Sequence, residues 1–148
     1  MASRRGDIMA DLLATLEGIQ EEYGYRHDVE VVYPYLVAEP SQYPAIMVQE
    51  TTEEVRDIAY PKMVRFLSLT IYGLNRVRTS LRDRPDIAAR DLIADMEQAV
   101  LRDPTRGGHA IDTAVAGSEV VMVDDDQVAV SVDVRVQYQT LRTDPTRS

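Results

Sequence analysis

Two stretches of the chain repeat apolar residues at helical spacing. The first, residues 7–23, places an apolar residue every three or four positions, at Ile8, Leu12, Leu16, Ile19 and Tyr23. The second, residues 86–102, does the same at Ala88, Leu92, Met96, Ala99 and Val100. Such a stripe is the buried face of an amphipathic helix. We therefore predict two helices, the first ended by Gly24 in a left-handed conformation and the second opened by Pro85.

Five other segments have the short apolar runs or the alternation of β-strands: 28–37, 44–50, 62–74, 112–123 and 128–138. In the last one, apolar residues occupy every even position from 128 to 138, and polar or small residues occupy the odd ones. That pattern predicts a half-buried antiparallel strand. Pro34 predicts an edge or a bend in 28–37. Because 62–74 is apolar on both faces, we expect a central strand, covered in part by another subunit.

The predicted order is α-β-β-β-α-β-β, with polar connections at 51–61 and 75–85. Two amphipathic helices packed on one face of a mainly antiparallel sheet make an α+β fold. At 148 residues the chain fits one domain. We expect that domain to span residues 1–141 and to be followed by a flexible C-terminal tail, 142–148.

The composition excludes several kinds of site and partner. The chain has no cysteine, so it has neither disulfides nor thiolate zinc ligands. Its net charge of −9 disfavours binding to DNA phosphates and to anionic membranes. No apolar run is long enough for a membrane span, and the N-terminal residues lack the apolar core of a secretory signal. We therefore expect no membrane partner and no export.

Candidate chemistry is sparse. His27 and His109 have no nucleophile at a catalytic spacing and are interpreted as loop histidines in solvent or at an interface. Asp124, Asp125 and Asp126 could hold a hard cation, but such a run more often caps a turn and blocks strand aggregation. The glycine pair after Arg106 lacks the remainder of a phosphate-binding motif. We predict no catalytic residue, no metal and no cofactor.

Two features point toward protein contacts. Arg76, Arg78, Arg82 and Arg84 form a basic cluster without interleaved aromatic residues. They suit either a solvated loop or a contact with a carboxylate-rich protein surface. Five tyrosines fall within residues 23–43. Tyrosine is common at interfaces, although these five also fit ordinary strand positions.

Several segments taken together resemble the tail terminator (tail completion) proteins of long-tailed bacteriophages. These are the N-terminal helix with a short strand, YPAIMVQE before an acidic segment, and the long strand KMVRFLSLTIYG. An arginine-rich loop then enters ARDLIADMEQAVLRDP, and the chain closes with VRVQYQTLRTDP. The resemblance covers essentially the whole chain and lies in the order and texture of its elements.

The resemblance implies a virion structural protein, assembled in the host cytoplasm, that forms a homo-hexameric ring on the tail tube. The ring would end tube polymerisation, dock to the head–tail connector protein and let DNA pass without specific binding. Contact candidates under this reading are Glu53, Glu54, Arg56 and Asp57, the arginines Arg76, Arg78 and Arg82, and the turn Asp124, Asp125 and Asp126. The alternatives are a head–tail connector or stopper protein, a small metal-dependent nuclease using the aspartate run, and a non-viral binding module.

Overall fold

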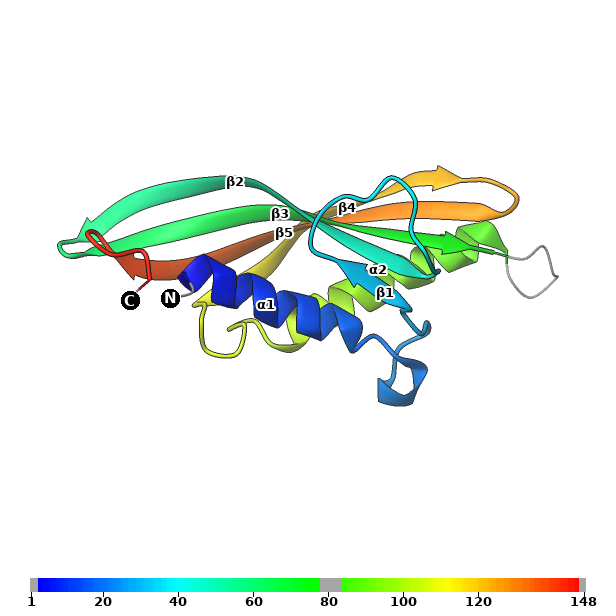
Figure 1. The fold of residues 1–148 in the computed structure, drawn as a ribbon, viewed down its shortest axis with the longest axis horizontal. Coiled ribbons are helices and arrows are strands. Elements are labelled where there is room, and N and C mark those ends of the chain that lie inside the picture. The colour runs from blue at the N-terminus through cyan, green and yellow to red at the C-terminus, as the bar shows by residue number, and fades with distance from the viewer. Residues whose placement is uncertain (1–2, 78–83, 147–148) are drawn as a thin grey trace.

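Both helices lie against one face of a five-stranded sheet in the computed structural model, which describes residues 3–77 and 84–146 (Figure 1). The elements are α1 (Arg4–Glu17), the short 3₁₀ helix η1 (Glu21–Tyr23), β1 (Val31–Tyr33), β2 (Ala45–Ala59), β3 (Lys62–Arg76), α2 (Pro85–Arg102), β4 (Asp112–Val123) and β5 (Gln127–Leu141). The predicted α+β class and element order are confirmed.

The sheet is long and mostly antiparallel. Its strand order is β1-β2-β3-β5-β4, and only the three-residue pairing of β1 with β2 is parallel. β3 pairs with β5 along its whole length and with β2 from Lys62 to Leu74, so it is the central strand that its apolar residues predict. The long ladders give the molecule two distant ends, one at the β2–β3 turn and the other at the β4–β5 turn (Figure 1).

The core lies between the helices and the sheet face that they cover. Val48, Ile71 and Val132 stand in register on β2, β3 and β5, and all three are buried. The predicted alternation of β5 is confirmed, since its valines at even positions and Tyr138 are buried in this core. α2 approaches β3 so closely at Gly73 that an added Cβ would lie 2.7 Å from the Met96 sulfur.

The first helix differs from its prediction at both ends. It begins at Arg4, because the Ser3 side chain accepts a hydrogen bond from the Gly6 amide at 2.9 Å and caps it. It ends at Glu17, where Gly18 follows, rather than at residue 23. Gly24 does adopt the predicted left-handed conformation, with φ 93°, but it closes η1.

The prediction that residues 51–61 form a connection is wrong. β2 continues to Ala59, and the chain turns only at Tyr60 and Pro61. The polar residues form a strand because β3 offers a continuous antiparallel partner there. Conversely, the predicted strand 28–37 shrinks to three residues that end before Pro34. After β5 the chain turns back, and the Arg142 amide donates to the Pro61 carbonyl at 2.6 Å.

Candidate assembly surfaces

The predicted contact residues that the structure describes fall at the two distant ends of the sheet. Glu53, Glu54, Arg56 and Asp57 lie on the projecting half of the β2–β3 hairpin, residues 50–66, which we call the hairpin arm. The aspartate turn, residues 124–126, lies at the other end, where the Val77 amide donates to the Asp126 carbonyl at 2.8 Å. Arg76 ends β3 beside that turn. Arg78 and Arg82 lie outside the described residues.

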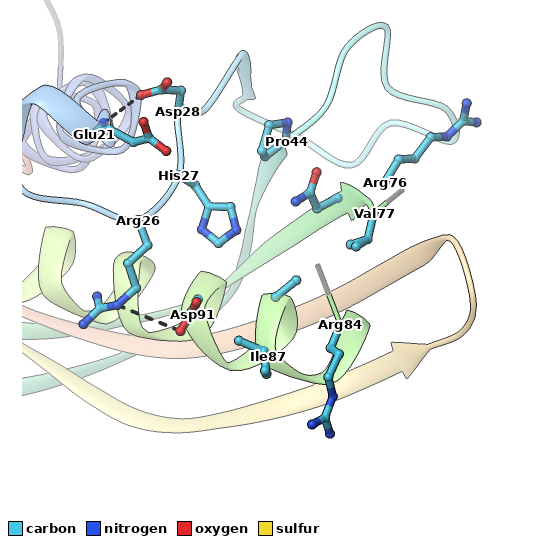
Figure 2. A pocket seen from close by; sticks show the side chains of 12 residues that line it. Glu21, Arg26, His27, Asp28, Pro44, Arg76, Val77, Arg84, Ile87 and Asp91 are labelled. Atoms are coloured by element: carbon cyan, nitrogen blue, oxygen red, sulfur yellow. Dashed lines mark hydrogen bonds and ion pairs between the residues drawn. The ribbon is translucent and has the colours of Figure 1, made fainter. Parts of the chain in front are cut away.

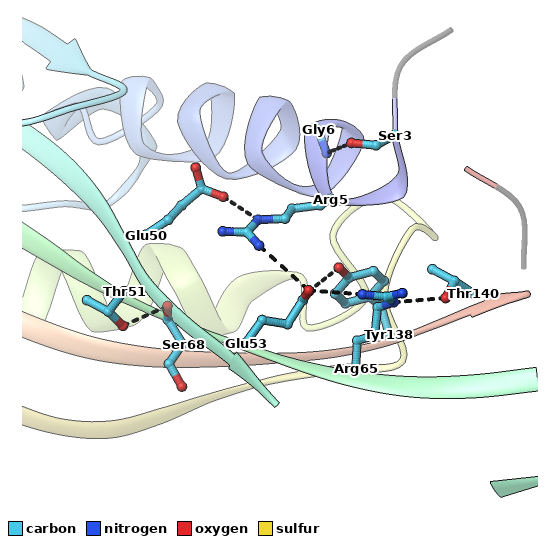
Figure 3. Close-up of polar contacts among 10 residues, drawn as sticks. All are labelled: Ser3, Arg5, Gly6, Glu50, Thr51, Glu53, Arg65, Ser68, Tyr138 and Thr140. Carbon is cyan, nitrogen blue, oxygen red and sulfur yellow. Dashed lines mark hydrogen bonds and ion pairs between the residues drawn. The ribbon is translucent and has the colours of Figure 1, made fainter. Parts of the chain in front are cut away.

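Glu53 is the centre of a polar cluster beneath the arm (Figure 3). Its carboxylate accepts the Tyr138 hydroxyl and an Arg65 guanidinium N–H at 3.1 Å. Arg65 also donates to the Thr140 hydroxyl at 2.9 Å. Burial, followed by the bond to Glu53, raises the pKa of Tyr138, so the tyrosine stays a neutral donor. Glu53 is therefore a structural acceptor that joins β2 to β5 across β3.

The other arm carboxylates are paired with arginines of the same chain. Glu50 binds Arg5 of α1 at 2.7 Å, and this hydrogen bond is the main cause of the raised pKa of Arg5. Glu54 binds Arg56 at 2.7 Å and Arg135 at 3.3 Å. These two arginines also lie over the Phe66 ring, with guanidinium carbons 5.4 and 4.3 Å from its centroid. Asp57 lies 4.0 Å from Arg142.

The pairing of these charges within the chain reduces what they can contribute to binding a partner. Because the carboxylates already have cations beside them, a partner gains little by supplying another. The exposed apolar side chains of the arm are Val55, Ile58 and Tyr60, of which Tyr60 at the tip is 78% exposed. Such side chains gain free energy when a partner covers them. The apolar residues of the arm, rather than its charges, are thus its best contact candidates.

The aspartate turn is held by its own first residue. The Asp124 carboxylate accepts the amides of Asp126 at 3.1 Å and Gln127 at 2.8 Å, and these bonds lower the pKa of Asp124. The Asp126 carboxyl, hydrogen-bonded to Asp124 and repelled by its charge, has a raised pKa. No group of three His, Cys, Asp or Glu side chains is arranged for a metal ion within residues 3–77 and 84–146. The arrangement is that of a turn cap.

Beside the turn, β4 exposes a run of apolar side chains. Val120, Val121, Met122 and Val123 are consecutive, and Val121 is 52% exposed. They lie on an outer strand of the sheet, paired on one side only, with β5. Arg76 is close by, but its guanidinium stacks over the Tyr43 ring at 4.8 Å. The two ends of the sheet therefore each carry exposed apolar residues of different sequence and shape.

His27 is not a solvated loop residue. Its Nδ1 lies 2.9 Å from the carboxylate of Asp95, which is fully buried on α2 and also accepts the Arg26 amide at 3.0 Å. Burial acts to raise the pKa of Asp95, but the bonds from His27 and Arg26 outweigh it and lower that pKa. Asp95 was not singled out in the sequence, although an aspartate between Leu92 and Met96 interrupts an apolar stripe.

The His27 ring lies in a pocket of about 510 Å³ (Figure 2). A histidine oriented by a buried aspartate supplies two of the three members of a catalytic triad. The described residues that line this pocket include no serine, threonine or cysteine to act as the nucleophile. The guanidinium groups of Arg76 and Arg84 point away from its centre (Figure 2). The pair therefore ties the segment after η1 to α2 and has no reacting partner among these residues.

Arg106 is the other polar group that the sequence did not reveal. It is fully buried, and its guanidinium donates to the carbonyls of Val100 and Asp103 at the end of α2. Asp11 of α1 lies 3.8 Å away. Burial lowers the pKa of Arg106, with Asp11 opposing the shift. The residue closes the carboxyl end of one helix against the other, so the loop that contains it has a structural role.

Comparisons with known proteins add no relative. No protein family model matches the chain, and no curated protein matches it. Among the described residues, none of the helices has the length and apolar character required to cross a bilayer.

Proposed function

We propose that the chain is a virion structural protein, a tail terminator whose copies form a ring on the end of a phage tail tube. The sequence resemblance suggests this role, and the confirmed α+β fold is compatible with it. The ring would stop the tube from growing and present the surface that docks to the head–tail connector. In this role the protein acts by shape and catalyses no reaction.

One observation carries the proposal: the exposed large apolar residues of β2, of the β2–β3 turn and of β4 form two unlike groups at opposite ends of one sheet. One group is Val55, Ile58 and Tyr60 on the arm, and the other is residues 120–123 on β4. A two-fold dimer buries the same patch on both copies, whereas unlike patches join copies head to tail. Head-to-tail contacts close into a ring when the rotation between copies allows it. Two unlike ends therefore favour a ring over a simple dimer.

The sheet face without helices suits a lumen through which DNA passes. It carries polar side chains together with the half-buried Phe66 and Tyr72, and there the Thr70 hydroxyl donates to Asp133 at 2.8 Å. Its arginines Arg56 and Arg135 are paired with Glu54. A nucleic acid held by counterion release needs cations that are available to its phosphates. With these cations paired and a net charge of −9, the ring would let DNA slide without specific binding.

The test is to image the purified protein by negative stain and to measure its mass by light scattering, alone and with tube protein. Rings that cap tube ends support the proposal. A monomer at high concentration in both conditions would reject it and favour the binding module. Deleting the gene separates the closest alternative, because overlong tails indicate a terminator, whereas leaking filled heads with normal tails indicate a connector or stopper.

A further inference from the structure

The sheet ends in two edges with unpaired backbone groups. β1 pairs with β2 only at its first three residues, Ala45 to Met47, so within the described chain residues 48–59 have no strand on their outer side. β4 pairs with β5 alone, which leaves its outer side open along twelve residues. Open edges invite another strand, and proteins usually block them with proline, charged side chains, bulges or a covering segment. Neither 48–59 nor 112–123 contains proline or lysine.

The strand directions allow these two edges to meet in copies of the same chain. From β2 through β3 and β5 to β4 every pairing is antiparallel, so β4 runs opposite to β2. When copies stand side by side in the same orientation, β4 of one is therefore antiparallel to β2 of the next. Four alternating strands can thus repeat around a ring without a parallel junction.

We infer that ring subunits join by antiparallel pairing of β4 of one copy with the hairpin arm of the next. The inference rests on the proposed ring and names the contact that closes it. Backbone hydrogen bonds would join the outer sides of the two strands. The binding partner of each edge is thus a second copy of this chain.

The side chains at the two edges fit such a junction. Residues 120–123 carry no charge, and Val55 and Ile58 are exposed on the arm. Apolar pairs across neighbouring strands stabilise a sheet. The arm's carboxylates face their own arginines, Glu53 with Arg65 and Glu54 with Arg135, so an incoming strand does not meet unpaired charge. Because these carboxylates are paired within one chain, they repel a second negatively charged copy less than unpaired carboxylates would.

The irregularities of the edges suit closure into a ring. β2 shifts register between Glu50 and Thr52, and β4 between Val115 and Gly117. Bulges of this kind bend a strand and increase its twist. Because β1 covers the start of β2, the apolar end of β4 can reach only the arm, and neighbouring copies must therefore be shifted along the strands. A closed sheet requires such a stagger.

The absence of cysteine makes the contact testable by crosslinking. The double variant Val55→Cys/Val121→Cys, assembled into rings and treated with a short bis-maleimide, should give a ladder of trimers and larger species. Each single variant should give no ladder. The matched control is Tyr35→Cys/Val121→Cys, because Tyr35 is exposed but lies on neither edge, and it should give none.

The outcomes separate this inference from the proposed function. Rings in the electron microscope without a ladder would overturn the β4–arm contact and leave the terminator role standing. Dimers from Val121→Cys alone, as abundant as those of the double variant, would show β4 pairing with itself and also overturn it. A chain that forms no ring, alone or on tube ends, would overturn both.

A second variant tests the same contact without a crosslinker. Val121→Lys places a charge on the open edge and should abolish rings. The circular dichroism spectrum should stay unchanged, and so should the unfolding midpoint when both proteins are compared at a concentration at which the wild type is not assembled. Leu101→Lys is the matched control, since Leu101 is 48% exposed and lies on α2 rather than on an edge strand, and its rings should persist. Rings that persist in Val121→Lys would contradict the inference.

Discussion

The Tyr138 hydroxyl on β5 donates a hydrogen bond to the Glu53 carboxylate on β2, although the two strands are not neighbours in the sheet. The bond crosses over β3, whose Arg65 contacts the same carboxylate. It closes the arm on the helix-covered side, where Arg5 of α1 also approaches Glu53 at 3.6 Å (Figure 3). The projecting half of the hairpin is thereby held by polar bonds where the apolar core has ended.

Removing this acceptor should destabilise the fold. Glu53→Ala leaves the buried Tyr138 hydroxyl and the partly buried Arg65 guanidinium without their shared partner, and such groups cost about 1–3 kcal/mol when left unpaired. Urea unfolding followed by circular dichroism gives the free energy of unfolding. Glu54→Ala is the control, because its carboxylate is exposed and its loss should change stability by less than about 0.5 kcal/mol. Equal losses in the two variants would contradict the structural role of Glu53.

The Asp95 carboxylate should make stability depend on acid pH. Its pKa in the folded state lies below the unfolded value of about 3.9, since His27 and Arg26 stabilise the charged form. The stabilisation it supplies is therefore fully present above about pH 4 and is lost as the pH falls through the lower folded pKa. Asp95→Asn should be less stable by about 1–3 kcal/mol at neutral pH, with the difference shrinking in acid.

The measurement is the free energy of unfolding of both proteins as a function of pH. Asp91→Asn serves as the control, because Asp91 is an exposed residue one helical turn away and touches Arg26 only at 3.9 Å. A difference between wild type and Asp95→Asn that stays constant from neutral pH to below pH 3 would contradict the assignment of the linkage to this carboxylate.

Gly73 should be intolerant of a side chain. A Cβ there would lie 2.7 Å from the Met96 sulfur and 2.9 Å from a Leu92 methyl carbon, closer than packed atoms allow. Gly73→Ala should therefore destabilise the protein by about 1–3 kcal/mol, the usual cost of overpacking. Adding Met96→Ala to Gly73→Ala should relieve part of the clash. In a double-mutant cycle, the double variant should therefore lose less free energy of unfolding than the sum of the losses in the two single variants. Gly117→Ala on β4 is the control, since nothing lies within 4 Å of the added atom, and it should unfold like the wild type.

Local pattern accounts for most of the fold. The alternation of β5 and the stripe of α2 each follow from contacts that a single element makes with the core, so their periodicity was sufficient to predict them. The arm lacks such a stripe, because its carboxylates are matched by arginines and a tyrosine elsewhere in the chain. Glu53 and Tyr138 are 85 positions apart, so a pattern in a short stretch of sequence cannot predict their hydrogen bond. A connection was the natural prediction for 51–61, and it was wrong for this reason.

The candidate contact residues show the same contrast between what a local sequence pattern predicts and what contacts between distant residues decide. The charged residues of the arm are the ones that their chemistry suggests, but pairing within the chain occupies them. The exposed Val55 between them, and Ile58 and Tyr60 after them, have no such signal in the sequence. Asp95 and Arg106 are buried charges whose partners come from other elements. An interrupted apolar stripe was the only sequence signal for Asp95, and Arg106 had none.

The arm's apolar residues, and not its charges, should govern assembly. Ile58→Asp replaces a side chain that is 56% exposed and leaves the core intact. At a concentration at which the wild type is not assembled, the free energy of unfolding should therefore change by no more than about 0.5 kcal/mol. Ring formation should be lost, because the junction would then bury a charge without a partner. Asp57→Asn, one position away, removes a carboxylate that lies 4.0 Å from Arg142 at the surface, and its rings should form normally. Light scattering and negative stain on both variants decide the matter. Rings that survive Ile58→Asp and disappear in Asp57→Asn would instead indicate that the charged residues of the arm make the contact.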